Sequence, residues 1–138
     1  MLLIDRKISW QQALKEVAFD DTPIGSIGLF EIKGTVKFKL IAIGLTDVVS
    51  TSASISAGVS EATTALIPLT SASNITQDSI WINSVPVKNL TLYDDAQWRI
   101  GVNTNIILNV TGDSVDSGKI LFILEYQCLD DNAKVIVS

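Results

Sequence analysis

The stretch Trp98–Val110 reads WRIGVNTNIILNV and decides the fold class of this chain. Every second position in its thirteen residues is apolar except for one threonine. These positions are Trp98, Ile100, Val102, Thr104, Ile106, Leu108 and Val110. Successive side chains of a β-strand point to opposite faces, so this period of two places one row against a core. The pattern predicts a long central strand of a β-sandwich.

Other segments with the same period follow one another at steady spacing, with polar turns between them. In Thr35–Leu40 the apolar residues face inward while Lys37 and Lys39 face outward, and Ile41–Leu45 is apolar on both faces. A strand that is apolar on both faces is expected to be covered on both sides. Ala53–Val59 alternates with serine and glycine, so a second backbone can approach its small-residue face.

The remaining strand candidates are 65–69, 79–83, 90–93, 119–129 and 134–137. Many short strands with short turns and almost no helix are typical of an antiparallel sandwich. We therefore predict an all-β, jelly-roll-like sandwich over residues 28–138. The connecting sequence TGDSVDSG indicates that 98–110 and 119–129 form an adjacent hairpin.

Residues 1–27 differ in composition from the rest and are interpreted as an N-terminal arm. Ser9-Trp10-Gln11-Gln12 has the pattern of a capping box and precedes Ala13, Leu14 and Val17, which favours a short helix. A competing interpretation is a strand over Glu16–Phe19, because Val17 and Phe19 alternate with Glu16 and Ala18.

Length and charge exclude several classes of function. The 138 residues are enough for one domain, and 47% hydrophobic content with 18% charged residues favours apolar surface buried between subunits. The net charge is −5 and the ten basic residues are scattered, so we expect binding neither to nucleic acid nor to a membrane surface. The apolar run Met1–Ile4 is too short for the core of a signal peptide, which predicts synthesis in a cytoplasm.

Histidine is absent from the sequence, which removes the commonest general base and the commonest transition-metal ligand. The single cysteine, Cys128, is interpreted as a small buried hydrophobe. Paired acids such as Asp94-Asp95 and Asp130-Asp131 lie in predicted turns, where a Ca²⁺ site is the rival to simple backbone capping. We expect no enzyme activity, no cofactor and no bound metal.

Four residues of the predicted strands stand out as candidates for contact with another subunit. Glu125 is an acid in the middle of a strand, where pairing with a base across a sheet or an interface competes with a role as a lone catalytic carboxylate. Trp81 points opposite to Ile80 and Ile82, which fits a subunit contact or, with Trp98 and Tyr93, a sugar platform. Asn105 and Ile107 lie on the outer row of the long strand.

Four stretches of the sequence resemble small virion proteins of tailed bacteriophages. They are Gly34-Thr-Val, then ALIPLTSASNI at 65–75 with DSIWIN at 78–83, and GKILFILEYQCLDDNAKV at 118–135. The resemblance is to capsid decoration, or cement, proteins with a jelly-roll fold, and it covers roughly residues 28–138.

This resemblance implies a homotrimer that binds the major capsid protein lattice and stabilises the shell at the virion surface. It makes residues 1–26, including Trp10 and Leu14, candidates for contact with the capsid or a neighbouring subunit. A carbohydrate-binding or fibre-type, receptor-binding β-sandwich module of a virion is the alternative function.

Overall fold

The computed structural model describes residues 10–88 and 96–138. Nearly all of the described chain is antiparallel β-structure, with one short 3₁₀ turn, η1 (Ala72–Asn74). The strands are β1 (Gln11–Thr22), β2 (Gly25–Val49), β3 (Ser54–Val59), β4 (Ala62–Ser71), β5 (Ser79–Trp81), β6 (Val87–Lys88), β7 (Arg99–Thr111), β8 (Val115–Cys128) and β9 (Lys134–Val137). The predicted all-β class is confirmed.

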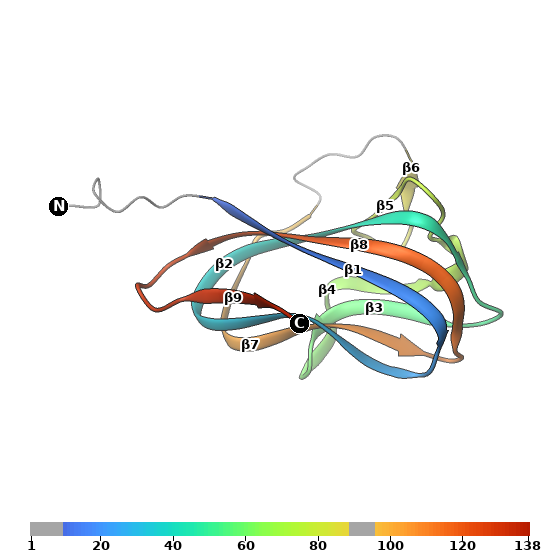
Figure 1. The fold of residues 1–138 in the computed structure, drawn as a ribbon, viewed down its shortest axis with the longest axis horizontal. Helices are drawn as coiled ribbons and strands as arrows, with labels where there is room; N and C mark the ends of the chain where they lie inside the picture. The colour runs from blue at the N-terminus through green and yellow to red at the C-terminus, as the bar shows by residue number, and fades with distance from the viewer. Residues whose placement is uncertain (1–9, 89–95) are drawn as a thin grey trace.

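The long strand β2 belongs to two sheets. Its first half pairs with β7 on one side and β9 on the other, and its second half pairs with β8 and β5. Figure 1 shows β2 bending at the left of the view and passing from one layer to the other. The first sheet is therefore β1-β8-β2-β5-β6, and the second sheet is β9-β2-β7-β3-β4.

The strand order is that of a jelly roll. When the halves of β2 are counted as two strands and the short β6 and β9 are set aside, the sheets read 1-8-3-6 and 2-7-4-5. A jelly roll is this pair of interleaved antiparallel sheets packed face to face. The predicted sandwich is confirmed. The strands counted here as the second and the third are the two halves of β2, which is continuous and bent.

The core lies between the two sheets, and both lateral sides of the sandwich are closed. Phe122 and Leu124 from the first sheet and Ile106 and Leu108 from the second are all fully buried. On one side the Lys15 ammonium donates a hydrogen bond to the Ser138 carbonyl oxygen, which links the β1 edge to the end of β9. The other side is closed by the buried indole of Trp81.

Trp81 closes the second lateral side from inside the core. Its side chain is fully buried, its Nε1–H donates a 2.8 Å hydrogen bond to the Thr70 hydroxyl on β4, and its ring meets Phe122 edge-on with centroids 6.1 Å apart. A buried indole N–H needs such a partner. The hypothesis of Trp81 as a subunit contact or sugar platform is therefore wrong.

The helix predicted near the N-terminus is also wrong. Gln11–Thr22 forms the edge strand β1 and pairs along its length with β8, with Ala13, Val17 and Phe19 facing the core. The competing strand interpretation for Glu16–Phe19 is confirmed. Pairing with β8 buries this inner row, and that tertiary contribution outweighs a local capping signal.

The strand β7 is central, between β2 and β3. Its even-numbered side chains point to solvent at the N-terminal end and into the core at the C-terminal end. Asn103 has a φ of 47° and accepts a 2.8 Å hydrogen bond from the Gly34 N–H, at a point where the β2–β7 register shifts. Gly34 has a φ of 75°, so both residues adopt the left-handed region that glycine and asparagine tolerate best. Because of this bulge, Ile100 and Val102 are 67% and 57% exposed, whereas Ile106 is buried.

Two further predictions concern neighbours of β7. The hairpin predicted between β7 and β8 does not form, because the two strands lie in different sheets and each pairs with β2. The close approach predicted at the small-residue face of β3 is confirmed. An added Cβ at Gly58 would lie 2.2 Å from the Ala62 carbonyl oxygen, and the Ser56 hydroxyl donates a 2.9 Å hydrogen bond to the Thr63 carbonyl.

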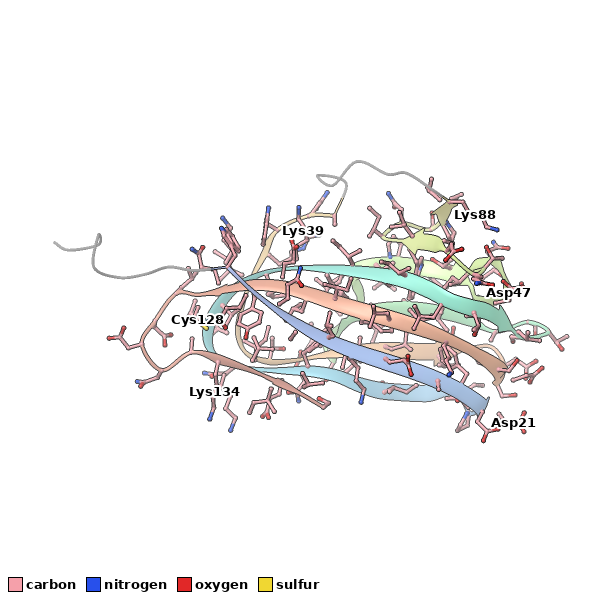
Figure 2. All side chains as sticks on the ribbon, turned by 45° about the horizontal axis from the view of Figure 1, so that its top comes forward. Asp21, Lys39, Asp47, Lys88, Cys128 and Lys134 are labelled. Atoms are coloured by element: carbon pink, nitrogen blue, oxygen red, sulfur yellow. The ribbon has the colours of Figure 1, made fainter. Side chains whose placement is uncertain are left out.

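Charged side chains are spread around the sandwich. Figure 2 shows Asp21 and Asp47 at one end, Cys128 and Lys134 at the other, and Lys39 between them on the first sheet. Cys128 is half-buried rather than buried, and burial together with the nearby Asp130 charge raises the pKa of its thiol. The thiol is therefore protonated at neutral pH and is a poor nucleophile.

Candidate functional site

The first sheet carries apolar side chains on its outer face as well as its inner face. Strand register places Leu14, Ile123 and Ile41 in one row across β1, β8 and β2, and places Leu121, Ile43 and Ile80 in the next row across β8, β2 and β5. Side chains that pair across antiparallel strands point to the same side. We call these six residues the outer apolar face.

The outer apolar face is exposed compared with the core beneath it. Leu14 is 52% exposed and the other five side chains are half-buried, while Phe122 and Leu124, on the opposite row of β8, are fully buried. Polar rows border it: Gln12, Glu125 and Lys39 at one end, and Lys119 with Thr46 at the other. An apolar centre with a polar rim is the usual composition of a protein–protein interface.

Two tryptophans from distant parts of the sequence stack beside this face. Trp10 precedes β1 and Trp98 precedes β7, and their rings lie 4.8 Å apart between centroids at an interplanar angle of 41°. Trp10 is 53% exposed and Trp98 is half-buried. Trp98 lies outside the core because the bulge at Asn103 reverses the facing of this end of β7.

Two lysines of β2 pack against the indoles. The Lys37 ammonium lies 5.6 Å from the Trp10 centroid and 5.3 Å from the Trp98 centroid, and the Lys39 ammonium lies 4.6 Å from the Trp98 centroid. These distances are within the range of cation–π attraction. Lys39 is fully buried although its strand position faces outward, because Trp98 covers it.

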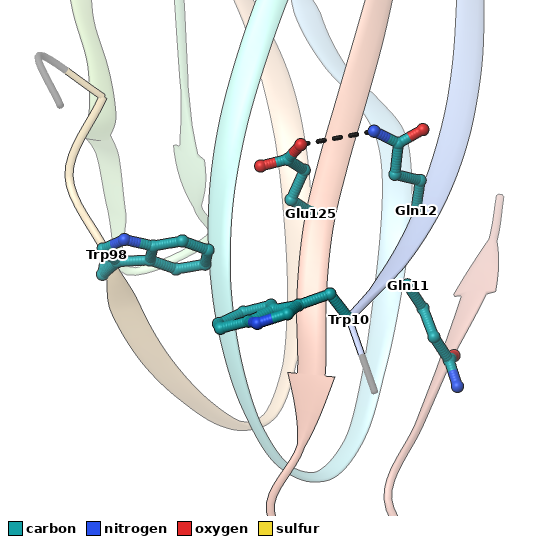
Figure 3. A pocket seen from close by; sticks show the side chains of 5 residues that line it. All are labelled: Trp10, Gln11, Gln12, Trp98 and Glu125. Carbon is teal, nitrogen blue, oxygen red and sulfur yellow. Dashed lines mark hydrogen bonds between the residues drawn. The ribbon is translucent and has the colours of Figure 1, made fainter. Parts of the chain in front are cut away.

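Glu125 and Gln12 complete a cavity of about 500 Å³ that is lined by Trp10, Gln11, Gln12, Trp98 and Glu125. The Gln12 amide donates a 3.2 Å hydrogen bond to one Glu125 carboxylate oxygen, as Figure 3 shows, and Glu125 is the register partner of Lys39 as well. Of the five lining residues, Glu125 has the one ionisable side chain. The arrangement offers aromatic surface next to hydrogen-bonding groups.

The structure brings three of the predicted contact residues together, because Trp10, Leu14 and Glu125 lie on or beside the outer face of the first sheet. Asn105 is exposed, but it lies on the second sheet, opposite Glu31. Tyr93 and residues 1–9 of the predicted contact arm lie outside the described residues.

The prediction of Ile107 as a surface contact is wrong, because this side chain is 7% exposed. Its register neighbours on both sides are glycines, Gly28 and Gly58. Ser138 lies against Gly28, and the backbone of Ala62 and Thr63 lies against Gly58, so both spaces beside Ile107 are covered. The covering segments come from distant parts of the chain, which a strand pattern does not reveal.

Sequence reasoning missed five residues of the outer apolar face, namely Ile41, Ile43, Ile80, Leu121 and Ile123. A signal was present: Ile41–Leu45 is apolar on both faces, and residues 120–124 are five apolar residues in succession. Runs of this kind mark strands covered on both sides. Such a run predicts that both faces of the strand are buried, but it does not show whether the second face is buried by the same chain or by another subunit.

Among residues 10–88 and 96–138, no three histidine, cysteine or acidic side chains gather closely enough to hold a metal ion. No helix in that part of the chain is long and apolar enough to cross a membrane.

The fold is similar to that of a chain in a solved structure, whereas the sequence searches found no match. No family model matches the chain, and no curated protein matches its sequence. A chain in a solved structure described as the acidic stable capsid of Helicobacter pylori bacteriophage KHP30 superposes with a TM-score of 0.47 at 12% sequence identity. The superposition covers 94% of each chain.

Proposed function

We propose that the protein is a structural component of a bacteriophage virion that decorates and stabilises the capsid, as a homotrimer bound to the major capsid protein. The outer apolar face carries this proposal. Six apolar side chains on four adjacent strands form a surface suited to burial against another protein. The proposed role is structural and uses no catalytic residue.

Two other features support the assignment. The jelly roll is a common architecture of capsid domains, which is support by analogy. The sequence stretches that resemble decoration proteins also include much of β8, the strand that contributes Leu121 and Ile123 to the outer apolar face.

The test is a double variant of the outer apolar face, Leu121→Ser with Ile123→Ser. We expect the unchanged chain to elute as a trimer and to add to undecorated capsids of the virus that carries this sequence. We expect the double variant to elute as a folded monomer and to lose at least ten-fold in capsid occupancy. Both side chains are half-buried in the single chain, so the fold survives their truncation.

A matched control is Ile24→Ser, because Ile24 is 61% exposed and lies in the turn between β1 and β2, away from the outer apolar face. This variant should keep both the oligomer and the capsid occupancy. A monomeric unchanged chain that does not add to capsids contradicts the proposal. Loss of occupancy in the control as well as in the double variant contradicts the assignment of this face.

A further inference from the structure

The cavity beside the two stacked tryptophans has the composition of a binding site rather than of a simple packing surface. Its volume is about 500 Å³, within the range of small-molecule sites. One wall is aromatic, formed by Trp10 and Trp98, and the other is polar, formed by Gln12 and Glu125. Figure 3 shows both walls facing the same space, with Gln11 pointing away from it.

The aromatic wall is exposed and held in place. Trp10 is 53% exposed, which is costly in water for so large an apolar surface unless a ligand or partner covers it. The buried Lys39 ammonium lies 4.6 Å from the Trp98 ring centroid and fixes this indole from the sheet side, without occupying the cavity. A rigid aromatic surface loses little entropy when a ligand binds.

The polar wall offers a donor and acceptors side by side. Glu125 accepts from Gln12 through one carboxylate oxygen, and a carboxylate and a primary amide together keep further acceptor and donor capacity beyond this one bond. Adjacent hydroxyl groups, each able to donate and accept, match this set. A purely apolar ligand would leave these groups without partners, which is unfavourable.

The local charges favour an uncharged ligand. Lys37 and Lys39 lie against the indoles and Lys39 is the register partner of Glu125, so the opposite charges beside the cavity offset one another and give neither an anion nor a cation a strong advantage. The C–H groups on one face of a sugar ring carry small positive charges and pack well on the negative face of an aromatic ring. We propose that this cavity binds a neutral saccharide, with one ring stacked on Trp10 and Trp98 and its hydroxyls bonded to Gln12 and Glu125.

This inference goes beyond the capsid role, because it uses the polar border of the outer apolar face and the two tryptophans beside it, and none of the six apolar residues. It also moves the sugar platform considered for Trp81 and Trp98 to a pair that the sequence did not connect. The Trp10 and Trp98 rings are brought into contact although 88 positions separate them.

The test uses the full-length protein on an array of neutral and charged oligosaccharides, followed by titration of the best ligand with tryptophan fluorescence as the readout. We expect neutral glycans to bind and to change the fluorescence. Trp10→Ala and Glu125→Ala should each weaken binding at least ten-fold, and Trp10→Phe should retain most of it. Thermal unfolding of each variant checks that the fold is intact.

Ile100→Ala is the matched control, since Ile100 is an apolar residue 67% exposed on β7 and does not line the cavity. It should bind the saccharide like the unchanged chain. Binding of charged glycans alone, absence of binding to any neutral glycan, or equal affinity in Trp10→Ala overturns the proposal. Because the Leu121→Ser, Ile123→Ser variant leaves the cavity intact, its sugar titration separates failure of this site from failure of the capsid role.

Discussion

β8 carries two rows of apolar side chains that are chemically alike and differ in what lies against them. Ile120, Phe122 and Leu124 point inward and are fully buried, while Leu121 and Ile123 point outward and are half-buried. Burial against other atoms, rather than apolar character, determines how much a side chain stabilises a single chain. The inner row is therefore expected to stabilise the fold, and the outer row to stabilise an assembly.

Truncating two adjacent residues of β8, one from each row, is expected to give the largest difference. Phe122→Ala removes a fully buried ring that packs edge-on against Trp81, and should lower the free energy of unfolding by about 3 to 5 kcal/mol. Ile123→Ala should lower it by about 1 kcal/mol or less when measured on the dissociated chain. Urea unfolding of dilute protein measures both, and equal losses would contradict the division of β8 into two rows.

The second sheet gives a similar contrast between neighbours, Ile107 and Asn105. Ile107→Lys places an ammonium in a covered space beside Gly28 and Gly58, and should cost about 2 to 4 kcal/mol of stability. Asn105→Lys, at an exposed position, should change stability by less than about 0.5 kcal/mol. Thermal unfolding distinguishes the two. A folded but dissociated Ile107→Lys chain would instead restore Ile107 as an interface residue.

The fold class could be predicted from the sequence because strand periodicity is a local property. The period of two identified β7, the second half of β2 and β8, and the turn residues separated them. Pairing partners are not local, and the expected β7–β8 hairpin failed because β2 lies between these strands. A short polar connection fits a crossing between sheets as well as it fits a hairpin.

The bulge at Asn103 explains why the sequence pattern wrongly predicted that the N-terminal end of β7, with Ile100 and Val102, faces the core. A single residue in the left-handed region shifts the alternation, and Asn103 itself looks like any polar residue of the outer row. Trp98 was expected in the core for this reason, and instead it covers Lys39. The candidate cavity depends on this shift, so it could not be predicted from the strand pattern.

The smallest expected effect concerns Asp130, which holds the region where β2 crosses between the sheets. The Thr35 N–H donates a 2.9 Å hydrogen bond to its carboxylate, and the Asn132 N–H donates one of 3.0 Å. The bond from Thr35 has the largest effect, and together these bonds lower the pKa of Asp130 below its ordinary value. Thr35 pairs with Val102 and lies beside the register shift that separates the two ends of β7.

Because the carboxylate has a lower pKa in the folded chain than in the unfolded chain, its contribution is complete above the unfolded pKa of about 3.9. It is lost as the pH falls through the folded pKa. Asp130→Asn should therefore lower stability slightly at pH 7 and reduce the loss of stability on acidification below about pH 4. Urea unfolding from pH 7 to pH 2.5 measures both slopes. Parallel slopes for the two chains would mean that these hydrogen bonds do not favour the charged form.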